Sequence, residues 1–362
     1  MPIGTCHLSE HSLEHGYYAI TLENQFLRVT LLPEKGADIY SLVYKPRSTD
    51  VLWKAPWGLR RLRDRLPGAN TEATWLDHYE GGWQEIFPNG GDACVYRGAP
   101  QVFHGEASIL PWNHAIRLRS GSQIEVEFSV QLYRTPFLLR RTVTVQENLA
   151  SVLIREVVQN QGDEEMHFMW GHHVAYGAPF LAAGCRLEIP AKAFLAHDGD
   201  TVSASRIKPG VSSPWPQVSG KNGRPVDLSL VPDADDRVTE FGYVRDLKEG
   251  WYGLVNPVEG FGVGLAWPKE VFRYIWLWQE LRGSFGYPWY GRCYVMGVEP
   301  FTSIPAAGLT SAIERGTAPS LAAGCSLEVR LAVVFFEATG RLQSISTDGI
   351  ARVLPGGSLD MG

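Results

Sequence analysis

Three segments of the chain place a histidine or an acidic residue among glycines and aromatic residues. The segment 81–112 contains His104, the segment 169–181 contains His173, and the segment 294–305 contains Glu299. Histidine titrates near neutral pH, and a glutamate buried among apolar residues has a raised pKa, so both residue types suit proton transfer. We therefore predict that His104, His173 and Glu299 form an acid–base site.

Two adjacent histidines compete for one of these positions. Residues that follow each other on a strand point to opposite faces, so either His172 or His173 faces a given cleft, but not both. The spacing alone leaves open which of them is the acid.

Aromatic residues are abundant, with 12 Trp, 14 Tyr and 15 Phe among 362 residues. Sugars stack on aromatic rings through their C–H faces, although such rings more often belong to the core. The candidate sugar-binding residues lie in the three segments and shortly before Glu299: Trp83, Gln84, Glu85, Asn89, His172, Trp278, Gln279, Trp289 and Tyr290.

The elements that must position these residues are strands. Apolar and polar residues alternate over 124–132 and over 327–333. The range 117–119 is predicted to pair with 124–132 as the other arm of a hairpin. The ranges 141–147 and 152–159 form another antiparallel pair around Asn148. Gly (38) and Pro (23) are spread over the whole chain, as many short strands require. The pattern predicts an all-β fold, a large antiparallel β-sandwich.

No boundary divides the chain, so we predict a single domain over 1–362, with 1–20 as a peripheral N-terminal segment. The ranges 208–216 and 221–236 are predicted to be long polar loops within it.

Charge and motifs exclude several classes of function. A net charge of −6 gives no general attraction to nucleic acids or anionic membranes. The five cysteines form no CxxC pair, and the HExxH, GxSxG and GxxxxGK[ST] motifs are absent. With neither a secretory leader nor an apolar span in view, we expect a cytoplasmic monomer or homodimer that acts on a small molecule.

Short motifs over nearly the whole chain resemble the aldose 1-epimerase (galactose mutarotase) superfamily. The range 24–53 is similar to the family's opening strands, and Phe103-His104-Gly105 is similar to its Leu-His-Gly segment. The range 173–177, His-Val-Ala-Tyr-Gly, resembles the family's His-x-Tyr-Phe-Asn segment. The range 297–300, Gly-Val-Glu-Pro, resembles the segment that supplies the general base, and 321–325 resembles the turn before the closing strand.

The resemblance implies a supersandwich fold and a cofactor-independent isomerase that interconverts the α and β anomers of a sugar. In that reaction Glu299 takes the proton from the O1 hydroxyl, His173 protonates the ring oxygen, and His104 contacts the sugar. Galactose mutarotases carry an arginine in a Gly-Arg-x-x-Asn-Arg element. The matching range 83–89 lacks this arginine. We expect Gln84 or Glu85 to replace it, Asn89 to keep the asparagine role, and the chain to belong to a divergent branch.

Two other functions fit the same fold. The first is a carbohydrate-binding protein without catalysis, and the second is a lyase or isomerase acting on an acidic sugar. The cluster Arg60, Arg61, Arg63 and Arg65 would suit a carboxylate or phosphate if it faced the cleft. Asp233, Asp235 and Asp236 offer oxygen ligands for calcium, but a polar turn explains them better, so we expect no metal.

Overall fold

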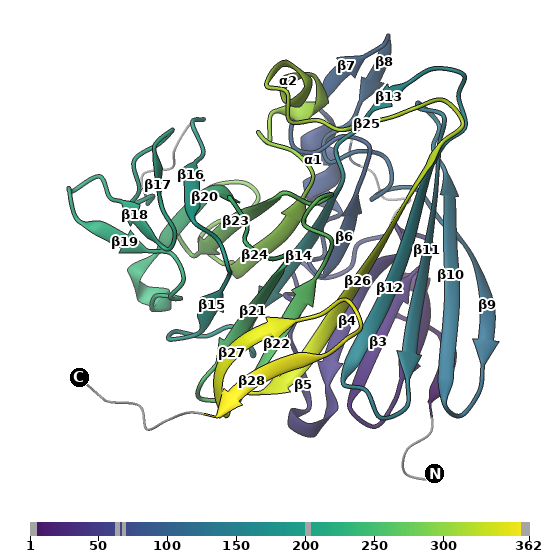
Figure 1. The fold of residues 1–362 in the computed structure, drawn as a ribbon, viewed down its shortest axis with the longest axis horizontal. Helices are drawn as coiled ribbons and strands as arrows, with labels where there is room; N and C mark the ends of the chain where they lie inside the picture. The colour runs from purple at the N-terminus through teal and green to yellow at the C-terminus, as the bar shows by residue number, and fades with distance from the viewer. Residues whose placement is uncertain (1–5, 62–65, 67–69, 200–203, 356–362) are drawn as a thin grey trace.

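Two large antiparallel sheets face each other in the computed structural model, which describes residues 6–61, 66, 70–199 and 204–355. Figure 1 shows the two sheets side by side, with the two α-helices at one end of the molecule. The predicted all-β antiparallel sandwich is therefore confirmed.

The larger sheet carries His173 and Glu299, two of the three predicted acid–base residues. Twelve described strands form it, in the order β1-β2-β3-β4-β6-β14-β24-β23-β20-β16-β17, with β5 paired to β4. Their bounds are β1 (His7–Ser12), β2 (Tyr18–Glu23), β3 (Leu27–Leu32), β4 (Asp38–Tyr44), β5 (Thr49–Asp50), β6 (Trp83–Ile86), β14 (Gly171–Gly177), β16 (Ala193–Ala196), β17 (Ser212–Pro214), β20 (Val238–Arg245), β23 (Tyr274–Leu281) and β24 (Tyr294–Phe301).

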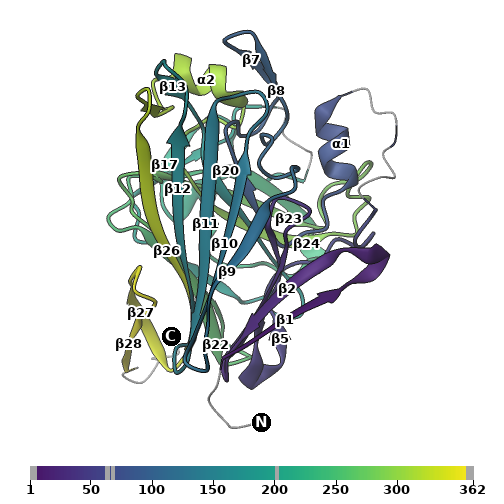
Figure 2. The ribbon, with the colours of Figure 1, turned by 90° about the vertical axis from the view of Figure 1, so that its right-hand side faces the viewer.

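The second sheet has eight described strands in the order β15-β21-β22-β26-β12-β11-β10-β9. Figure 2 shows its strands from β26 to β9 side by side. The bounds are β9 (Asn113–Arg119), β10 (Gln123–Gln131), β11 (Phe137–Gln146), β12 (Ser151–Asn160), β15 (Arg186–Glu188), β21 (Trp251–Asn256), β22 (Phe261–Ala266) and β26 (Ser326–Glu337).

Short elements cover the ends and outer faces of the sheets. They are the strand pairs β7 (Cys94–Tyr96) with β8 (Ala99–Gln101), β13 (Met166–His167) with β25 (Ser320–Leu321), β18 (Gln217–Ser219) with β19 (Pro225–Asp227), and β27 (Gly340–Ile345) with β28 (Ala351–Pro355). The helices are α1 (Thr71–Asp77), α2 (Gly308–Glu314) and the 3-10 turns Glu14–Gly16, Lys45–Arg47 and Ala234–Asp236.

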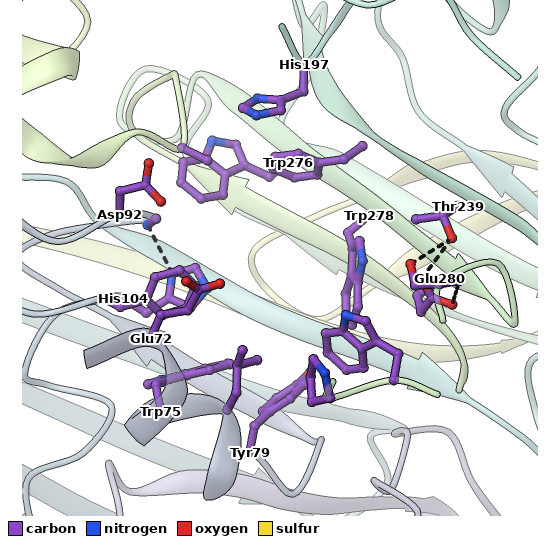
Figure 3. Close-up of a pocket in the computed structure, with 18 of the residues that line it drawn as sticks. Glu72, Trp75, Tyr79, Asp92, His104, His197, Thr239, Trp276, Trp278 and Glu280 are labelled. Atoms are coloured by element: carbon purple, nitrogen blue, oxygen red, sulfur yellow. Dashed lines mark hydrogen bonds between the residues drawn. The ribbon is translucent and has the colours of Figure 1, made fainter. Parts of the chain in front are cut away.

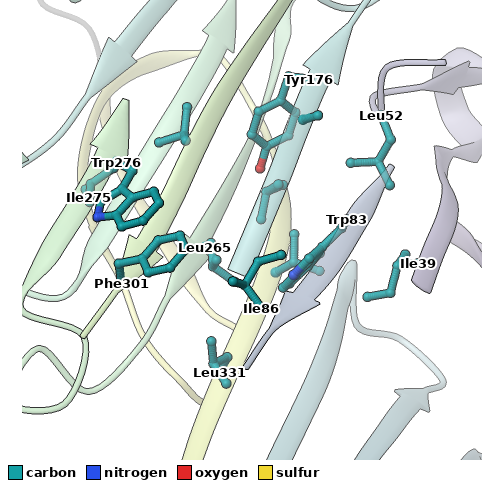
Figure 4. Packing of buried hydrophobic residues seen from close by; sticks show 14 of the residues in the cluster. Ile39, Leu52, Trp83, Ile86, Tyr176, Leu265, Ile275, Trp276, Phe301 and Leu331 are labelled. Carbon is teal, nitrogen blue, oxygen red and sulfur yellow. The ribbon is translucent and has the colours of Figure 1, made fainter. Parts of the chain in front are cut away.

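The main core fills the space between the two sheets. Figure 4 labels Ile39, Trp83 and Ile86 of the first sheet and Leu265 and Leu331 of the second, which belong to one buried cluster. These side chains are at most 1 % exposed. Burial of so much apolar surface contributes most of the free energy that holds the sheets together.

The strands predicted from alternation are confirmed as β9, β10, β11, β12 and β26, with the expected pairing of β9 with β10 and of β11 with β12. The ranges 208–216 and 221–236 differ from the prediction, because β17, β19 and a 3-10 turn lie within them. Residues 7–20 supply β1 and part of β2. These strands form one edge of the larger sheet, so residues 7–20 belong to that sheet. Among the described helices none is long and apolar enough to cross a membrane.

Candidate active site

The register of two neighbouring strands brings His173 and Glu299 together. Pairing of β14 with β24 places Gly171 opposite Phe301 and Ala175 opposite Gly297, so His173 falls level with Glu299. Directly opposed residues on antiparallel strands point to the same face, which here is the face turned away from the second sheet. The atoms His173 Nε2 and Glu299 Oε1 lie 3.6 Å apart.

Gly297 leaves room for the glutamate side chain. A Cβ atom added at this position would lie too close to Glu299 Oε1 and 3.2 Å from the Trp278 ring. Glycine is therefore required two residues before Glu299, on the same face of the strand, if the carboxyl group is to lie over the strand.

Burial sets the protonation state of this pair. Glu299 is 2 % exposed, and desolvation raises its carboxyl pKa well above the ordinary value. His173 is 5 % exposed, and burial, assisted by the charge of Lys35, lowers its pKa to about 4. The titratable proton that the two groups can share is therefore favoured on the carboxyl group of Glu299 over the ring of His173.

The second ring nitrogen of His173 faces Tyr79. Its Nδ1 atom lies 3.4 Å from the Tyr79 hydroxyl, whose pKa is raised chiefly by burial. Because Nε2 faces a carboxyl group that keeps its proton, we assign the histidine proton to Nδ1, which donates to the tyrosine oxygen. Tyr79 thereby leaves the Nε2 lone pair directed at Glu299.

His104 reaches the same place from a loop. Its backbone has a φ of 57°, a left-handed conformation that L-residues rarely adopt, and its ring centroid lies 5.5 Å from that of His173. The Gly91 N–H donates to His104 Nδ1 at 3.1 Å, while burial and then His173 lower the pKa of His104 well below the ordinary value. His104 is thus neutral, with Nε2–H as a hydrogen-bond donor.

Aromatic rings enclose the two histidines. Trp75 of α1 lies 4.7 Å from His104 and 5.6 Å from His173 between ring centroids, and it stacks on Tyr79 at 4.6 Å. Trp278 of β23 covers the other side, 6.0 Å from His173. These rings account for the loss of solvent that shifts both pKa values.

A cavity of about 680 Å³ opens over His104, His173 and Glu299, within the size range of small-molecule sites. Figure 3 shows His104 and Asp92 on one side of it, Thr239 and Glu280 on the other, and Trp276 and Trp278 between them. The strands β20 and β23 supply its wall because Phe241 pairs with Trp278 and Thr239 with Glu280.

The charge of the lining is negative. Glu72, Asp92 and Glu280 line the cavity together with Glu299, whose burial favours its uncharged form, and among the lining residues that the structure describes there is no Lys or Arg. The Glu280 carboxylate accepts hydrogen bonds from Thr239 Oγ1 at 2.9 Å and from the Ser284 N–H at 3.0 Å. The cavity therefore offers hydroxyl groups and aromatic faces, which suit a neutral polyol better than an anion.

Of the residues predicted from sequence, the structure brings five to the cavity: His104, His173, Glu299, Trp278 and Trp289. The adjacent His172 points to the opposite face, as the alternation rule requires. Its Nδ1 lies 3.5 Å from Glu85 Oε2 and its Nε2 lies 3.3 Å from Glu156 Oε2, in the space between the sheets.

The cluster around His172 is an ion network, and it explains the position of Glu85. Arg141 of the second sheet contacts Glu85 and, at 2.7 Å, Glu156. Burial and then the charge of Glu156 raise the pKa of Glu85, whereas His172 and Arg141 outweigh burial and lower the pKa of Glu156. Two carboxylates and a histidine are a ligand set for a metal ion, but here a guanidinium group already supplies the positive charge.

The remaining five predicted contacts lie outside the cavity. Trp83 donates to His172 Nδ1 in the core, and Gln84 Nε2 lies 3.4 Å from Asp38 Oδ2. Asn89 donates to the carbonyl groups of Asp92 and Val102 and accepts from the Leu309 N–H, so it holds loops together. Gln279 is directed to the inner face and donates to the Leu228 carbonyl, and Tyr290 is 56 % exposed beside the cavity.

Several lining residues escaped the sequence analysis. Trp75 and Tyr79 lie four residues apart and therefore on one face of α1 or its last turn, a spacing that the sequence displays. His197, which accepts or donates a hydrogen bond at 2.7 Å from the Tyr243 hydroxyl, follows the end of β16 and lacks any such signal.

The described part of the arginine cluster does not line the cavity. Arg60 donates to the Asp77 carbonyl at 2.8 Å and lies over the Trp57 ring, and Arg63 and Arg65 fall outside the described residues. Asp233, by accepting from the Asp235 N–H at 3.0 Å, caps a 3-10 turn, which supports a polar turn there.

Comparison with known proteins places this geometry in a wider group. The model of a family described as a domain of unknown function (DUF4432) matches residues 14–334. A search of curated proteins gave no match.

Solved structures with the same fold include a candidate aldose 1-epimerase from Klebsiella pneumoniae, which is 15 % identical with a TM-score of 0.71, over 92 % of this chain and 84 % of that one. A galactose mutarotase-like protein from Clostridium acetobutylicum is 14 % identical with a TM-score of 0.63, over 92 % and 99 %. A galactose mutarotase related enzyme from Lactobacillus acidophilus is 15 % identical with a TM-score of 0.58, over 88 % and 98 %. At such low identity these likenesses show a divergent galactose mutarotase-like fold.

Proposed function

Since the chain belongs to the family described as a domain of unknown function, DUF4432, we propose a function from the site itself: an aldose 1-epimerase that interconverts the anomers of a neutral sugar. The observation that carries the proposal is the buried pair His173 and Glu299, 3.6 Å apart, on the floor of a neutral-to-acidic aromatic cavity.

The pair holds the one proton that ring opening requires. Transfer of this proton from Glu299 to His173 gives a carboxylate and an imidazolium. A bound sugar stabilises both ions, because its O1–H donates to the carboxylate and its ring oxygen accepts from the imidazolium Nε2–H. Glu299 then removes the O1 proton while His173 protonates the ring oxygen, so the C1–O5 bond breaks and an aldehyde forms. Rotation about C1–C2 and the reverse proton transfers close the ring as the other anomer.

His104 contributes a fixed donor. Its Nε2–H is held by the tautomer that Gly91 imposes, so it offers a hydrogen bond to the ring oxygen or an adjacent hydroxyl without exchanging its own proton. The lack of Lys and Arg among the described lining residues disfavours a lyase or isomerase on an acidic sugar.

The pH profile should report the proton count of the pair. Activity requires that Glu299 and His173 together hold one titratable proton besides the one on His173 Nδ1. On the acid side kcat/KM should fall as His173 becomes an imidazolium while Glu299 stays protonated, near the His173 pKa of about 4. On the basic side kcat/KM should fall at the raised pKa of Glu299. We expect a plateau from about pH 5 through neutrality, measured by polarimetry after subtraction of the uncatalysed rate. An acid limb centred near pH 6.5 would contradict this assignment.

Tyr79 is predicted to act as a positioning residue for His173. Tyr79→Phe keeps the ring that stacks on Trp75 but removes the oxygen that accepts from His173 Nδ1. We expect kcat to fall about tenfold, with KM nearly unchanged and the acid limb of the profile shifted, since the histidine tautomer is no longer fixed. A loss confined to KM or to thermal stability would indicate that Tyr79 only packs.

The proposal is tested by polarimetry on freshly dissolved anomers of neutral aldoses, with uronic acids and sugar phosphates as comparisons. We expect catalysed mutarotation of at least one neutral sugar. Binding without acceleration, measured by calorimetry and unaffected by His173→Asn, would support a carbohydrate-binding protein instead.

A further inference from the structure

The cavity over the acid–base pair is larger than one sugar ring needs. Its 680 Å³ equals the liquid volume of about twenty water molecules, and each non-hydrogen atom of a sugar takes up less space than a water molecule, so the cavity exceeds what a hexose ring fills. We infer that its outer part binds a second sugar ring, so that the substrate is the reducing end of a neutral disaccharide or longer oligosaccharide. This inference rests on the proposed function.

Aromatic surface continues outward from the reacting centre. The Trp278 ring lies 6.0 Å from His173 and 5.2 Å from Trp289, and Trp289 lies 6.2 Å from Trp57. Figure 3 shows Trp278 between His104 on one side and Glu280 on the other. A ring bound at His173 thus meets Trp278 at its outer edge, and Trp289 provides the next stacking surface.

Tyr287 holds a third ring at the mouth of the cavity. Its side chain is 51 % exposed, yet its hydroxyl is fixed against α1, 3.1 Å from the Ala73 carbonyl oxygen and 3.0 Å from Asp77 Oδ1. A large ring that lines the cavity, is exposed and is held in one orientation presents a prepared face for a ligand.

The polar groups on the side of the cavity away from His104 are hydroxyl groups and the Glu280 carboxylate. Thr239 Oγ1 donates to Glu280 Oε2 at 2.9 Å and therefore accepts from Ser284 Oγ at 3.2 Å, while the Ser284 backbone N–H donates to Glu280 Oε1 at 3.0 Å. Without a cationic partner among the described lining residues, this end suits sugar hydroxyls and disfavours phosphate or carboxylate substituents.

The chemistry fixes how the two rings are joined. Anomeric exchange requires a free hydroxyl on C1 of the ring at the acid–base pair, so this ring is the reducing end. The second ring must be attached through another hydroxyl of the first, and its own C1 is locked in the glycosidic bond.

The test compares each monosaccharide with a disaccharide that ends in it: glucose with maltose and cellobiose, xylose with xylobiose, mannose with mannobiose, and galactose with galactobiose. We expect one disaccharide to exceed its monosaccharide in kcat/KM by about tenfold or more, the value of one stacked ring. Tyr287→Ala should remove most of this ratio, whereas Tyr287→Phe, which keeps the ring but loses its hydroxyl contacts with α1, should keep a larger part of it.

Phe285→Ala is the matched control, because Phe285 is an aromatic residue of the same loop, 69 % exposed and outside the cavity lining. Ratios near one for every pair, or ratios that Tyr287→Ala and Phe285→Ala change equally, would overturn the inference. If no sugar is accelerated at all, the proposed function fails instead, and calorimetric affinities for the same pairs then decide whether the second ring binds.

Discussion

Glu299→Gln should reduce kcat/KM by about 100- to 10,000-fold, the range expected when a general acid–base group is lost. The amide has nearly the shape of the carboxyl group but cannot exchange a proton with O1 or with His173. Polarimetry or NMR exchange on a sugar that the wild-type protein accelerates measures the loss.

The same substitution should stabilise the fold above neutral pH. In the folded protein the Glu299 pKa is raised, so the folded state keeps a proton that the unfolded chain loses above its pKa of about 4.3. This group therefore costs stability increasingly as the pH rises from that value to the raised pKa, and glutamine removes the cost. We expect a higher Tm than wild type at pH 8 and an equal Tm near pH 4. A variant that loses both activity and stability at pH 8 would contradict a buried, protonated Glu299.

Arg141→Met should be the most destabilising of the changes considered, by about 3–5 kcal/mol. The guanidinium group is 1 % exposed and contacts both Glu85 and Glu156, so its removal leaves two buried carboxyl groups and His172 without a permanent positive charge. Because the cluster lies between the sheets, the loss weakens the contact between them. Urea unfolding monitored by tryptophan fluorescence measures the change.

The control is the double variant Arg141→Met with Glu85→Gln. Removing one carboxylate together with its partner should recover part of the lost stability, and the double-mutant cycle gives the coupling between them. Additive effects would show that the contact in the structure contributes nothing. Activity of the folded fraction should stay close to wild type, because the cluster faces away from the cavity.

The alternation of apolar and polar residues predicted the strands of the second sheet well, because one face of that sheet is buried and the other is exposed to solvent. In β10 buried and less buried residues alternate at every position, and the sequence carries this pattern openly. In β14 all seven residues are buried, so no polar face marks which side holds the ligand.

This difference explains which site residues could be predicted. For His172 and His173 the alternation rule gives two opposite faces, and the resemblance selects His173. The same rule allows only one of Trp278 and Gln279 in a cleft, yet the sequence shows no wet face that would select between them. Trp83, Gln84 and Glu85 fail for the same reason, because β6 is buried on both sides.

Other residues depend on packing that local sequence does not encode. Trp75 and Tyr79 reach the histidines only because α1 folds over the outer face of the larger sheet, and the Tyr287 hydroxyl contacts Asp77 of α1. The contacts of the ion network join residues that are 15 to 87 positions apart along the chain, on strands of both sheets. Such contacts follow from the tertiary arrangement, not from spacing along one element.

The most direct test of anomeric acid–base chemistry is saturation-transfer NMR between the α and β C1 protons of the neutral sugar panel, with wild-type protein, His173→Asn and His172→Asn at equal folded concentration. We predict enzyme-dependent exchange for at least one sugar, loss of that exchange in His173→Asn, and its retention in folded His172→Asn. Exchange that is no faster than in buffer for every sugar, or that survives in His173→Asn, would contradict the assignment.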